Sequence, residues 1–288
     1  MANTIIIDGK NWFMRMYMVS KFKNIDKMKF IVENLIAYKQ TNQKSSLVFV
    51  FDTCKSERRL KIYPEYKAGR KSSLTEEERK EMYEHLSDFE SMIRSLGIRV
   101  YSGNGYEADD YVAKLTQMLR PRNLITINSS DEDFLQLVDD RVSVYLATKT
   151  LLITDSNINN YLGFDKRYYI DYKCIVGDKS DNIGGISGIG PKKAIKYINE
   201  YGSYLEIVEE LTKKSRKNKT DIKLINGIEQ YKIFKEIVDF KYCFEDEELY
   251  NIVLSQTQSA KPNKKKFIEL IKKYKLHKLA KDFSLIRK

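Results

Sequence analysis

The sequence predicts an α/β protein in which a mostly parallel central sheet is flanked by helices and followed by a helical C-terminal part. Two observations predict this fold class. Up to about residue 165, short continuous apolar runs alternate with stretches of helical periodicity, as in parallel sheets that are covered on both faces. Beyond that point strand patterns fade and helical patterns dominate. We therefore expect an α/β unit at residues 1–165 and a helical unit at residues 166–288.

The α/β unit is expected to start with a strand almost at the N-terminus. Thr75 and Glu78 have the spacing of a capping box, which predicts the start of a long helix, and Gly97 marks its end. The strands are expected at residues 3–8, 46–52, 98–102, from 123 onward, and at 142–148. The helices are expected at residues 26–43, 75–96, 106–119 and in the stretch before residue 138.

A polar and basic segment, "TCKSERRLKIYPEYKAGRKSSL", follows the second strand at residues 53–74. Its periodicity is weak, so we expect a loop that, with the start of the next helix, forms a basic arch at about residues 53–85. An aromatic side chain between basic ones suits a single nucleic-acid strand. Taken alone, the segment is also explained by an ordinary solvated loop.

The helical unit is expected to open with a glycine-rich hairpin, "CIVGDKSDNIGGISGIGPKKA", at residues 174–194. Glycines let the backbone approach a phosphate and aim N–H groups at it. Pro191 suits the first turn of a helix, whose N-terminal dipole adds positive potential. A plain glycine-rich connector is the alternative interpretation. The residues expected to bind a nucleic-acid backbone are Gly185, Gly188, Gly190, Lys192 and Lys193.

Composition narrows the chemistry. The 288 residues include three cysteines and two histidines, which leaves little for disulfides, zinc ligation or Ser-His-Asp catalysis. The N-terminus lacks the features of a signal peptide and no apolar run could span a bilayer, so we expect a cytoplasmic protein. The net charge of +11 favours a polyanionic partner, although a generic lysine-rich protein has the same balance.

Acidic residues follow nearly every predicted strand of the α/β unit and recur in the hairpin. The carboxyl ends of parallel strands meet at one edge of a sheet, so these acids are expected to gather in one cleft. Any single one is typical of a helix N-cap or a solvated charge, and the argument depends on all of them together. Hard divalent cations with oxygen ligands would neutralise such a cluster. The acids are Asp8, Asp52, Glu107, Asp109, Asp110, Asp131, Asp133, Asp178 and Asp181.

Five motifs in order, spanning residues 4–200, resemble the 5′ nuclease superfamily of flap endonucleases and 5′→3′ exonucleases. The resemblance is strongest to the bacteriophage flap endonucleases and to the 5′ nuclease domain of bacterial DNA polymerase I. "EADD" alone is a weak match, whereas the combined order and the hairpin block are specific. The chain length is that expected of a stand-alone enzyme without a polymerase. The motifs are "IIIDG", "YPEYKAGR", "EADD", "SSDEDFLQLV" and "GDKSDNIGGISGIGPKKA".

The resemblance implies a PIN-like fold, a helix-hairpin-helix at about residues 174–200, and two acid groups. It implies that Lys67 and Arg70 contact the scissile phosphate, that Tyr66 stacks on a displaced base, and that K⁺ can bind at the hairpin turn. Two Mg²⁺ ions, replaceable by Mn²⁺, would sit at the acids. The first acid group is Asp8, Asp52, Glu107, Asp109 and Asp110. The second acid group is Asp131, Asp133, Asp178 and Asp181, with some acids acting through water.

The function that these observations favour is structure-specific hydrolysis of DNA phosphodiesters near 5′ ends and 5′ flaps by two-metal-ion catalysis. The expected enzyme is a monomer that serves replication or repair, with replication proteins as partners and with RNA/DNA hybrids as further substrates through RNase H activity. One alternative is a non-catalytic helix-hairpin-helix protein that binds DNA junctions. A second alternative is a PIN-type ribonuclease.

Overall fold

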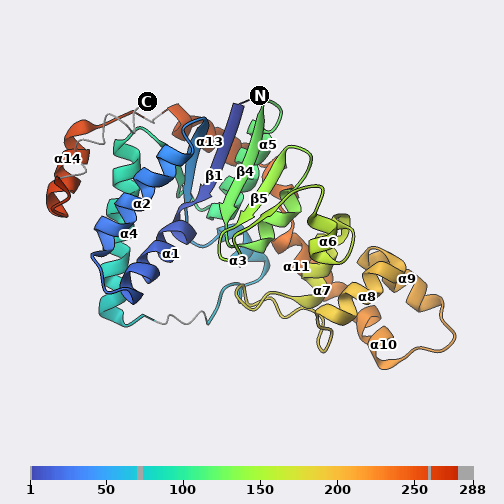
Figure 1. Ribbon diagram of the computed structural model, residues 1–288. Coiled ribbons are helices and arrows are strands. Elements are labelled where there is room, and N and C mark those ends of the chain that lie inside the picture. The colour runs from blue at the N-terminus through green and yellow to red at the C-terminus, as the bar shows by residue number, and fades with distance from the viewer. Residues whose placement is uncertain (1, 70–73, 259–260, 278–288) are drawn as a thin grey trace.

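The computed structural model describes residues 2–69, 74–258 and 261–277 and has a six-stranded sheet at its centre (Figure 1). The strand order is β3-β2-β1-β4-β5-β6; β1 to β5 run parallel, and β6 runs antiparallel to β5. The predicted mostly parallel sheet is confirmed, and β6 is a strand that the sequence analysis missed. The strands are β1 (Ala2–Asp8), β2 (Ser45–Phe51), β3 (Arg99–Ser102), β4 (Asn123–Ser129), β5 (Val142–Leu146) and β6 (Leu151–Ile153).

Helices cover the sheet on both faces. On one face, the ring of Phe89 packs against Phe13 and Phe49, with ring centroids 5.6 and 6.3 Å away. This face is covered by α1 (Gly9–Phe22), α2 (Lys27–Thr41) and α4 (Glu76–Ser95), and α14 (Lys264–Lys273) packs against α4 (Figure 1). The predicted capping box of α4 is present at Thr75 and Glu78. Helix α1 was not predicted, because it follows β1 without any intervening loop.

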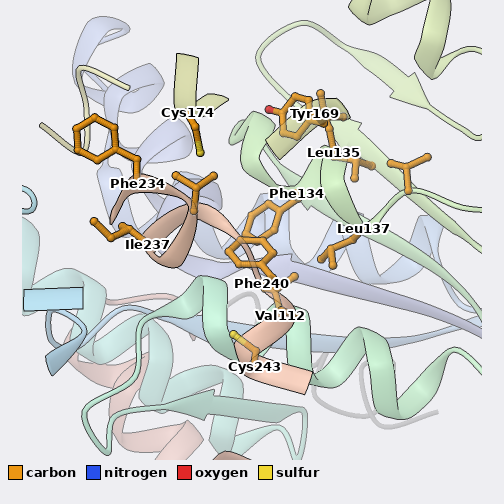
Figure 2. Close-up of a cluster of buried hydrophobic side chains, with 14 of the residues drawn as sticks. Val112, Phe134, Leu135, Leu137, Tyr169, Cys174, Phe234, Ile237, Phe240 and Cys243 are labelled. Atoms are coloured by element: carbon orange, nitrogen blue, oxygen red, sulfur yellow. The ribbon is translucent and has the colours of Figure 1, made fainter. Parts of the chain in front are cut away.

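The opposite face of the sheet packs on α5 and the C-terminal helices. One continuous hydrophobic cluster runs from the sheet into these helices. Figure 2 shows Phe134, which follows β4, beside Phe240, with ring centroids 6.1 Å apart. The C-terminal helices therefore support the chain segments that carry the acids. The remaining elements are α3 (Glu57–Ile62), α5 (Ala108–Leu119), η1 (Glu132–Leu137), α6 (Ile158–Leu162), η2 (Lys166–Tyr168), α7 (Tyr169–Val176), α8 (Pro191–Tyr201), α9 (Tyr204–Lys213), α10 (Lys219–Asn226), α11 (Ile228–Val238), α12 (Lys241–Glu245) and α13 (Glu247–Gln258).

The segment expected as an arch at residues 53–85 is more ordered than a loop. Helix α3 occupies its first half, with Ser56 as N-cap, and α4 begins at Glu76. Arg58 Nη1 donates to the backbone oxygen of Glu236 at 2.8 Å, which ties α3 to the end of α11. The prediction of a loop from residue 53 onward was therefore wrong at α3, because contacts with the C-terminal helices stabilise a short helix that local periodicity does not show.

The expected helix-hairpin-helix is confirmed by α7, the glycine-rich turn and α8. Asp178 and Ile183 form an isolated antiparallel bridge, with both backbone hydrogen bonds at 2.8 Å. Gly185 has a φ of +60°, and a Cβ atom there would lie 2.4 Å from the backbone carbon of Val176. The turn thus needs glycine both for its backbone conformation and for the close approach of its two arms. Within the described residues, we find no helix with the length and apolarity to cross a membrane.

Candidate active site

The acidic cleft lies at the point where the order of the strands in the sheet reverses. From β1 the chain builds β2 and β3 on one side, and it later builds β4 and β5 on the other side. Asp8 is the last residue of β1, and Asp131 follows the end of β4 by two residues. Asp52 comes directly after β2. Neighbouring strands therefore bring these carboxylates to the switch point of the sheet, where α/β proteins bind ligands.

Asp8 is held by protein donors on both of its oxygens. The Asn11 N–H donates to Oδ1 at 3.0 Å, which caps α1, and the Ser129 hydroxyl donates to Oδ2 at 2.8 Å. Burial raises the pKa of Asp8 to about 6, and the nearby carboxylate of Asp52 adds to the rise. The ionised form of Asp8 is therefore destabilised by its surroundings, and a bound cation would relieve this cost.

Two other acids show the same electrostatic conflict. Burial raises the pKa of Asp109, and Asp131 is the neighbouring carboxylate that contributes most to the rise. The pKa of Asp131 is also raised, by desolvation of its carboxyl group and by the carboxylates of Asp133 and Asp8. The residue as a whole is exposed, so solvent weakens this effect. These mutual influences place acids from β1, β4 and α5 within interaction distance of one another.

Arg59 is the buried counter-ion of Glu107 and Asp110 in the first acid group. The sequence analysis did not identify this role. Its Nη1 lies 2.9 Å from Glu107 Oε2 and its Nη2 lies 2.8 Å from Asp110 Oδ1, while only 2% of Arg59 is exposed. The Asp110 Oδ2 atom accepts a hydrogen bond from the Glu107 N–H at 2.9 Å. Because Asp110 is fully buried and is ion-paired with the buried Arg59, we place Asp110 behind the cleft and not among the residues that face it.

Tyr66 is also part of this buried network. Its hydroxyl donates to Glu107 Oε2 at 2.9 Å, and the residue is 1% exposed. The expected stacking of Tyr66 on a displaced base is therefore wrong for this structure, because the ring has no free face. The tyrosine instead holds Glu107 in place. Arg70, the other expected contact to the scissile phosphate, lies outside the described residues.

Lys67 connects the two acid groups. Its backbone N–H donates to the Asp181 carbonyl oxygen at 2.9 Å, and its Nζ donates to Glu107 Oε2 at 3.0 Å. The residue has a φ of +54°, which is uncommon for a non-glycine residue and marks a tightly determined backbone position. Burial lowers the pKa of Lys67, but Asp109 and other nearby carboxylates outweigh it, and the net pKa is raised. The ammonium is therefore permanently charged in the cleft.

The second acid group is built around Lys173, which the sequence analysis also missed. Its Nζ lies 2.6 Å from Asp133 Oδ1 and 2.6 Å from Asp178 Oδ2. The contact with Asp133 is an ion pair without the alignment of a good hydrogen bond. Burial alone would raise the pKa of Asp178, but Lys173 and Ser180 lower it to about 2. Asp178 is therefore ionised throughout the physiological pH range.

The hairpin presents its lysines at the start of α8. Gly190 is the N-cap residue, Pro191 is the first residue of the helix, and Lys192 and Lys193 are exposed in its first turn. Gly188 has a φ of +77°. The arrangement places two exposed lysines at the helix N-terminus, and their contact with a nucleic-acid backbone stays a prediction.

The chemistry of the cleft suits hard divalent ions. Its donors are carboxylate oxygens, and the pKa values of Asp8, Asp109 and Asp131 are raised by burial and by neighbouring carboxylates, which is the conflict that a divalent cation resolves. Within the described part of the chain, no three Asp, Glu, His or Cys side chains close around a single point as a finished cage. The carboxylate oxygens of the cleft are ligands that hard divalent cations prefer.

The raised pKa of Asp8 predicts how the free energy of unfolding depends on pH when metal is removed. Its pKa in the folded state is raised from 3.8 to about 6, so its stabilising effect is complete below the unfolded value and is lost as the pH rises through 6. In EDTA, the free energy of unfolding should fall by at most about 3 kcal/mol between pH 4 and 7. Urea unfolding at several pH values measures this. Asp8→Asn should flatten the fall, and an unchanged slope in that variant would contradict the assignment.

The fold and the site together define a protein of the nuclease class. The chain belongs to the 5′-3′ exonuclease family: the model of the family's N-terminal resolvase-like domain matches residues 3–163 and that of its C-terminal SAM fold matches residues 164–265. It is 32% identical to a 5′-3′ exonuclease of Mycoplasma pneumoniae over 305 residues, covering 99% of both chains. It is 33% identical over 175 residues to DNA polymerase I of Deinococcus radiodurans, covering 60% of this chain and 17% of that protein.

Solved structures give the same result. The fold is similar to a zinc-bound T5 5′-exonuclease, with a TM-score of 0.78 and 25% identity over 90% of this chain and all of the other. It is also similar to the bacteriophage T5 D15 flap endonuclease in a pseudo-enzyme–product complex with DNA and metal ions, with a TM-score of 0.77 and 26% identity over 90% and 99% of the two chains. The resemblance found in the motifs is thereby confirmed at the level of fold and family.

Proposed function

We propose that this protein is a structure-specific 5′ nuclease that hydrolyses DNA phosphodiesters at 5′ ends and 5′ flaps with two divalent ions, Mg²⁺ above all. One observation carries the proposal: Lys67 lies between the two acid groups, bound to Glu107 through its ammonium and to Asp181 through its backbone. A phosphate held by ions at both acid groups would meet this ammonium, which would offset charge that develops during hydrolysis. The cation and the acids are positioned together before the substrate arrives.

The residues of the chain divide the work. When bound, the two ions would supply an activated water and stabilise the leaving oxygen of an in-line displacement. Asp8, Asp52 and Asp109 of the first acid group would hold one ion, and Asp131, Asp133, Asp178 and Asp181 of the second would hold the other, partly through water. Glu107 forms ion pairs with Arg59 and Lys67, and it orients Lys67 toward the cleft. No side-chain general base is required.

The hairpin would bind the duplex beside the cleft. Lys192 and Lys193, with the N-terminus of α8, supply backbone contacts without base readout. K⁺ fits this turn less well, because the Gly188 carbonyl oxygen accepts a hydrogen bond from Lys193 Nζ at 3.5 Å and Lys223 Nζ lies against Gly188. These ammonium groups already place positive charge at the turn, which disfavours the binding of K⁺ there.

The wider setting follows from the family. The relatives named 5′-3′ exonuclease and DNA polymerase I support a role in replication or repair. We propose that this role includes removal of primers and flaps, with RNA/DNA hybrids as further substrates. We propose that the protein acts in the cytoplasm as a monomer, with contacts to replication proteins. Mn²⁺ is expected to replace Mg²⁺, because both accept oxygen ligands.

A cleavage assay tests the proposed function. A 5′-flap duplex, a 5′-ended duplex and an RNA/DNA hybrid are each incubated with the purified protein in Mg²⁺ or in EDTA. We expect Mg²⁺-dependent products from the flap and the 5′ end, and none in EDTA. Junction binding that ignores Mg²⁺ and yields no product would favour a binding protein instead. Cleavage of single-stranded RNA alone would favour a PIN-type ribonuclease.

Lys67 provides a second test of the proposed function. Lys67→Ala should slow cleavage of the flap by about 100-fold or more, since a donor aimed at developing charge contributes about 3 kcal/mol, while DNA affinity changes far less. Single-turnover rates and binding isotherms measure the two effects separately. Lys61→Ala, an exposed lysine of the same segment, is the matched control. Equal losses of rate and affinity in Lys67→Ala would reduce Lys67 to a binding contact.

A further inference from the structure

The second acid group contains its own cation. Lys173 projects from α7, Asp133 belongs to η1, and Asp178 lies in the hairpin, so three separate segments meet at one ammonium group. The side chains of these three residues are 11%, 14% and 20% exposed. Both Nζ–O distances are 2.6 Å, which are the lengths of close ion pairs.

The position of this ammonium is significant for metal binding. A divalent ion that bridged Asp133 and Asp178 directly would need the same oxygen atoms, at about 2.0–2.1 Å for Mg²⁺. Two cations cannot share those oxygens, because they repel each other strongly at such a separation even in a partly screened site. A cavity of about 400 Å³, lined by Asn11, Asp131, Lys173 and Ser180 among others, adjoins the pair and leaves room for an ion with its waters.

We propose that Lys173 is a built-in counter-ion of the second acid group, a positioning residue that holds Asp133 and Asp178 together and competes with the divalent ion there. The identity of that ion rests on the proposed function. The hairpin is thereby fixed to the sheet half of the molecule whether or not metal is bound. A direct consequence is that the ion at the second acid group binds more weakly than the ion at the first.

The other charged groups around the site do not replace Lys173. Glu132, next in sequence to Asp133, is paired with Lys149 and bonded to Tyr161, so it is turned to a different partner. The Ser180 hydroxyl and N–H both donate to Asp178 Oδ1, whereas Lys173 contacts the other oxygen, Oδ2. Lys173 is therefore the cation shared between the hairpin and η1 in the described structure.

Metal binding to the DNA-free protein tests the proposal without any measurement of cleavage. Isothermal titration with Mg²⁺ and with Mn²⁺ should show a tighter and a weaker site in the wild-type protein. In Lys173→Met the weaker site should tighten by about tenfold or more, because an unopposed pair of carboxylates attracts a divalent ion more strongly. Lys179→Met removes an exposed charge next to Asp178 and should leave both sites unchanged.

Thermal unfolding gives an independent readout. Lys173→Met should unfold at a lower temperature than wild type in EDTA and recover in Mg²⁺, whereas Lys173→Arg should keep both the wild-type stability and the weak site. Adding Asp133→Asn to Lys173→Met should abolish the gain in affinity. Unchanged metal affinity in Lys173→Met, or instability that Mg²⁺ does not repair, would overturn the proposal. A wild-type protein that binds metal as described but leaves flap DNA intact would overturn only the proposed function.

Discussion

The double variant Asp131→Asn with Asp178→Asn is expected to cleave a 5′-flap duplex at least about 1000-fold more slowly than the wild-type protein. One substitution removes a negative charge from the switch point and the other removes one from the hairpin. Stabilisation of the transition state by bound ions is worth several kcal/mol, and each 1.4 kcal/mol is a factor of ten in rate. Single-turnover rates in saturating Mg²⁺ measure the loss.

The two substitutions should preserve the local turns, and Lys173 keeps its ion pair with Asp133 when the pair with Asp178 is lost. Asp131 Oδ1 accepts the Asp133 N–H at 2.8 Å, and Asp178 Oδ1 accepts the Ser180 N–H at 2.7 Å. The side-chain oxygen of asparagine can accept the same hydrogen bonds, so the local turns persist. Asp165→Asn is the matched control, because Asp165 accepts the Arg167 N–H at 3.0 Å in a turn of the same kind away from the cleft.

Binding separates this prediction from a general loss of function. Flap DNA should bind the double variant at least as tightly as it binds the wild-type protein in EDTA, because two anions that repel phosphate have been removed. Wild-type turnover in the double variant would show that these acids are not the catalytic metal ligands. Parallel losses of rate and affinity would place the defect in DNA binding.

The position of the acids could be predicted because it depends on short-range rules. Continuous apolar runs are typical of buried parallel strands, and the ends of such strands meet at one edge of a sheet. Asp8 and Asp52 end or follow the two clearest runs, β1 and β2. The glycine-rich turn was equally readable, because Gly185 and Gly188 adopt backbone conformations that other residues rarely take.

The internal cations could not be predicted in this way. Arg59 lies in "KSERRLK", a polar stretch that by itself resembles solvated loop, and its burial depends on the Ile237 carbonyl oxygen far along the chain, which accepts from Nε at 3.1 Å. Ser56 ahead of α3 was the one local sign of a helix. Lys173 likewise gains its role from Asp133, which lies forty residues earlier. Charge pairing across the fold carries no periodicity in the sequence.

Tyr66 was expected to stack on a base, and its burial depends on long-range contacts that the local sequence does not show. An aromatic residue between basic ones is compatible with base stacking, and local sequence offers no reason to choose otherwise. The choice is made by Glu107, which accepts from the Tyr66 hydroxyl, from Arg59 and from Lys67. A buried carboxylate needs this many donors, and the arch segment supplies all three. The part of the arch segment that contains Arg59, Tyr66 and Lys67 therefore packs against the first acid group and is not a solvated loop.

Arg59→Met is expected to destabilise the folded protein by about 3–5 kcal/mol, because removing one partner of a buried ion pair leaves uncompensated charge. Glu107 and Asp110 would lose their contacts at 2.9 and 2.8 Å, and the Ile237 carbonyl oxygen would lose its donor. Methionine fills similar volume, so the loss is mainly electrostatic. Urea unfolding at neutral pH in EDTA measures the change. Arg58→Met is the control, since it also removes a bond to a backbone carbonyl, that of Glu236, but Arg58 faces the Tyr242 ring and not the acids, so the loss should be smaller.

A triple variant separates lost charge pairing from lost packing. If the cost of Arg59→Met comes from stranded carboxylates, then adding Glu107→Gln and Asp110→Asn should recover a large part of it, because neutral amides are less costly to bury than anions. The Asp110 side chain would still accept from the Glu107 N–H, which preserves the start of α5. If the triple variant is no more stable than Arg59→Met, then the arginine contributes through packing and its carbonyl contact, and the first acid group does not require an internal cation to fold.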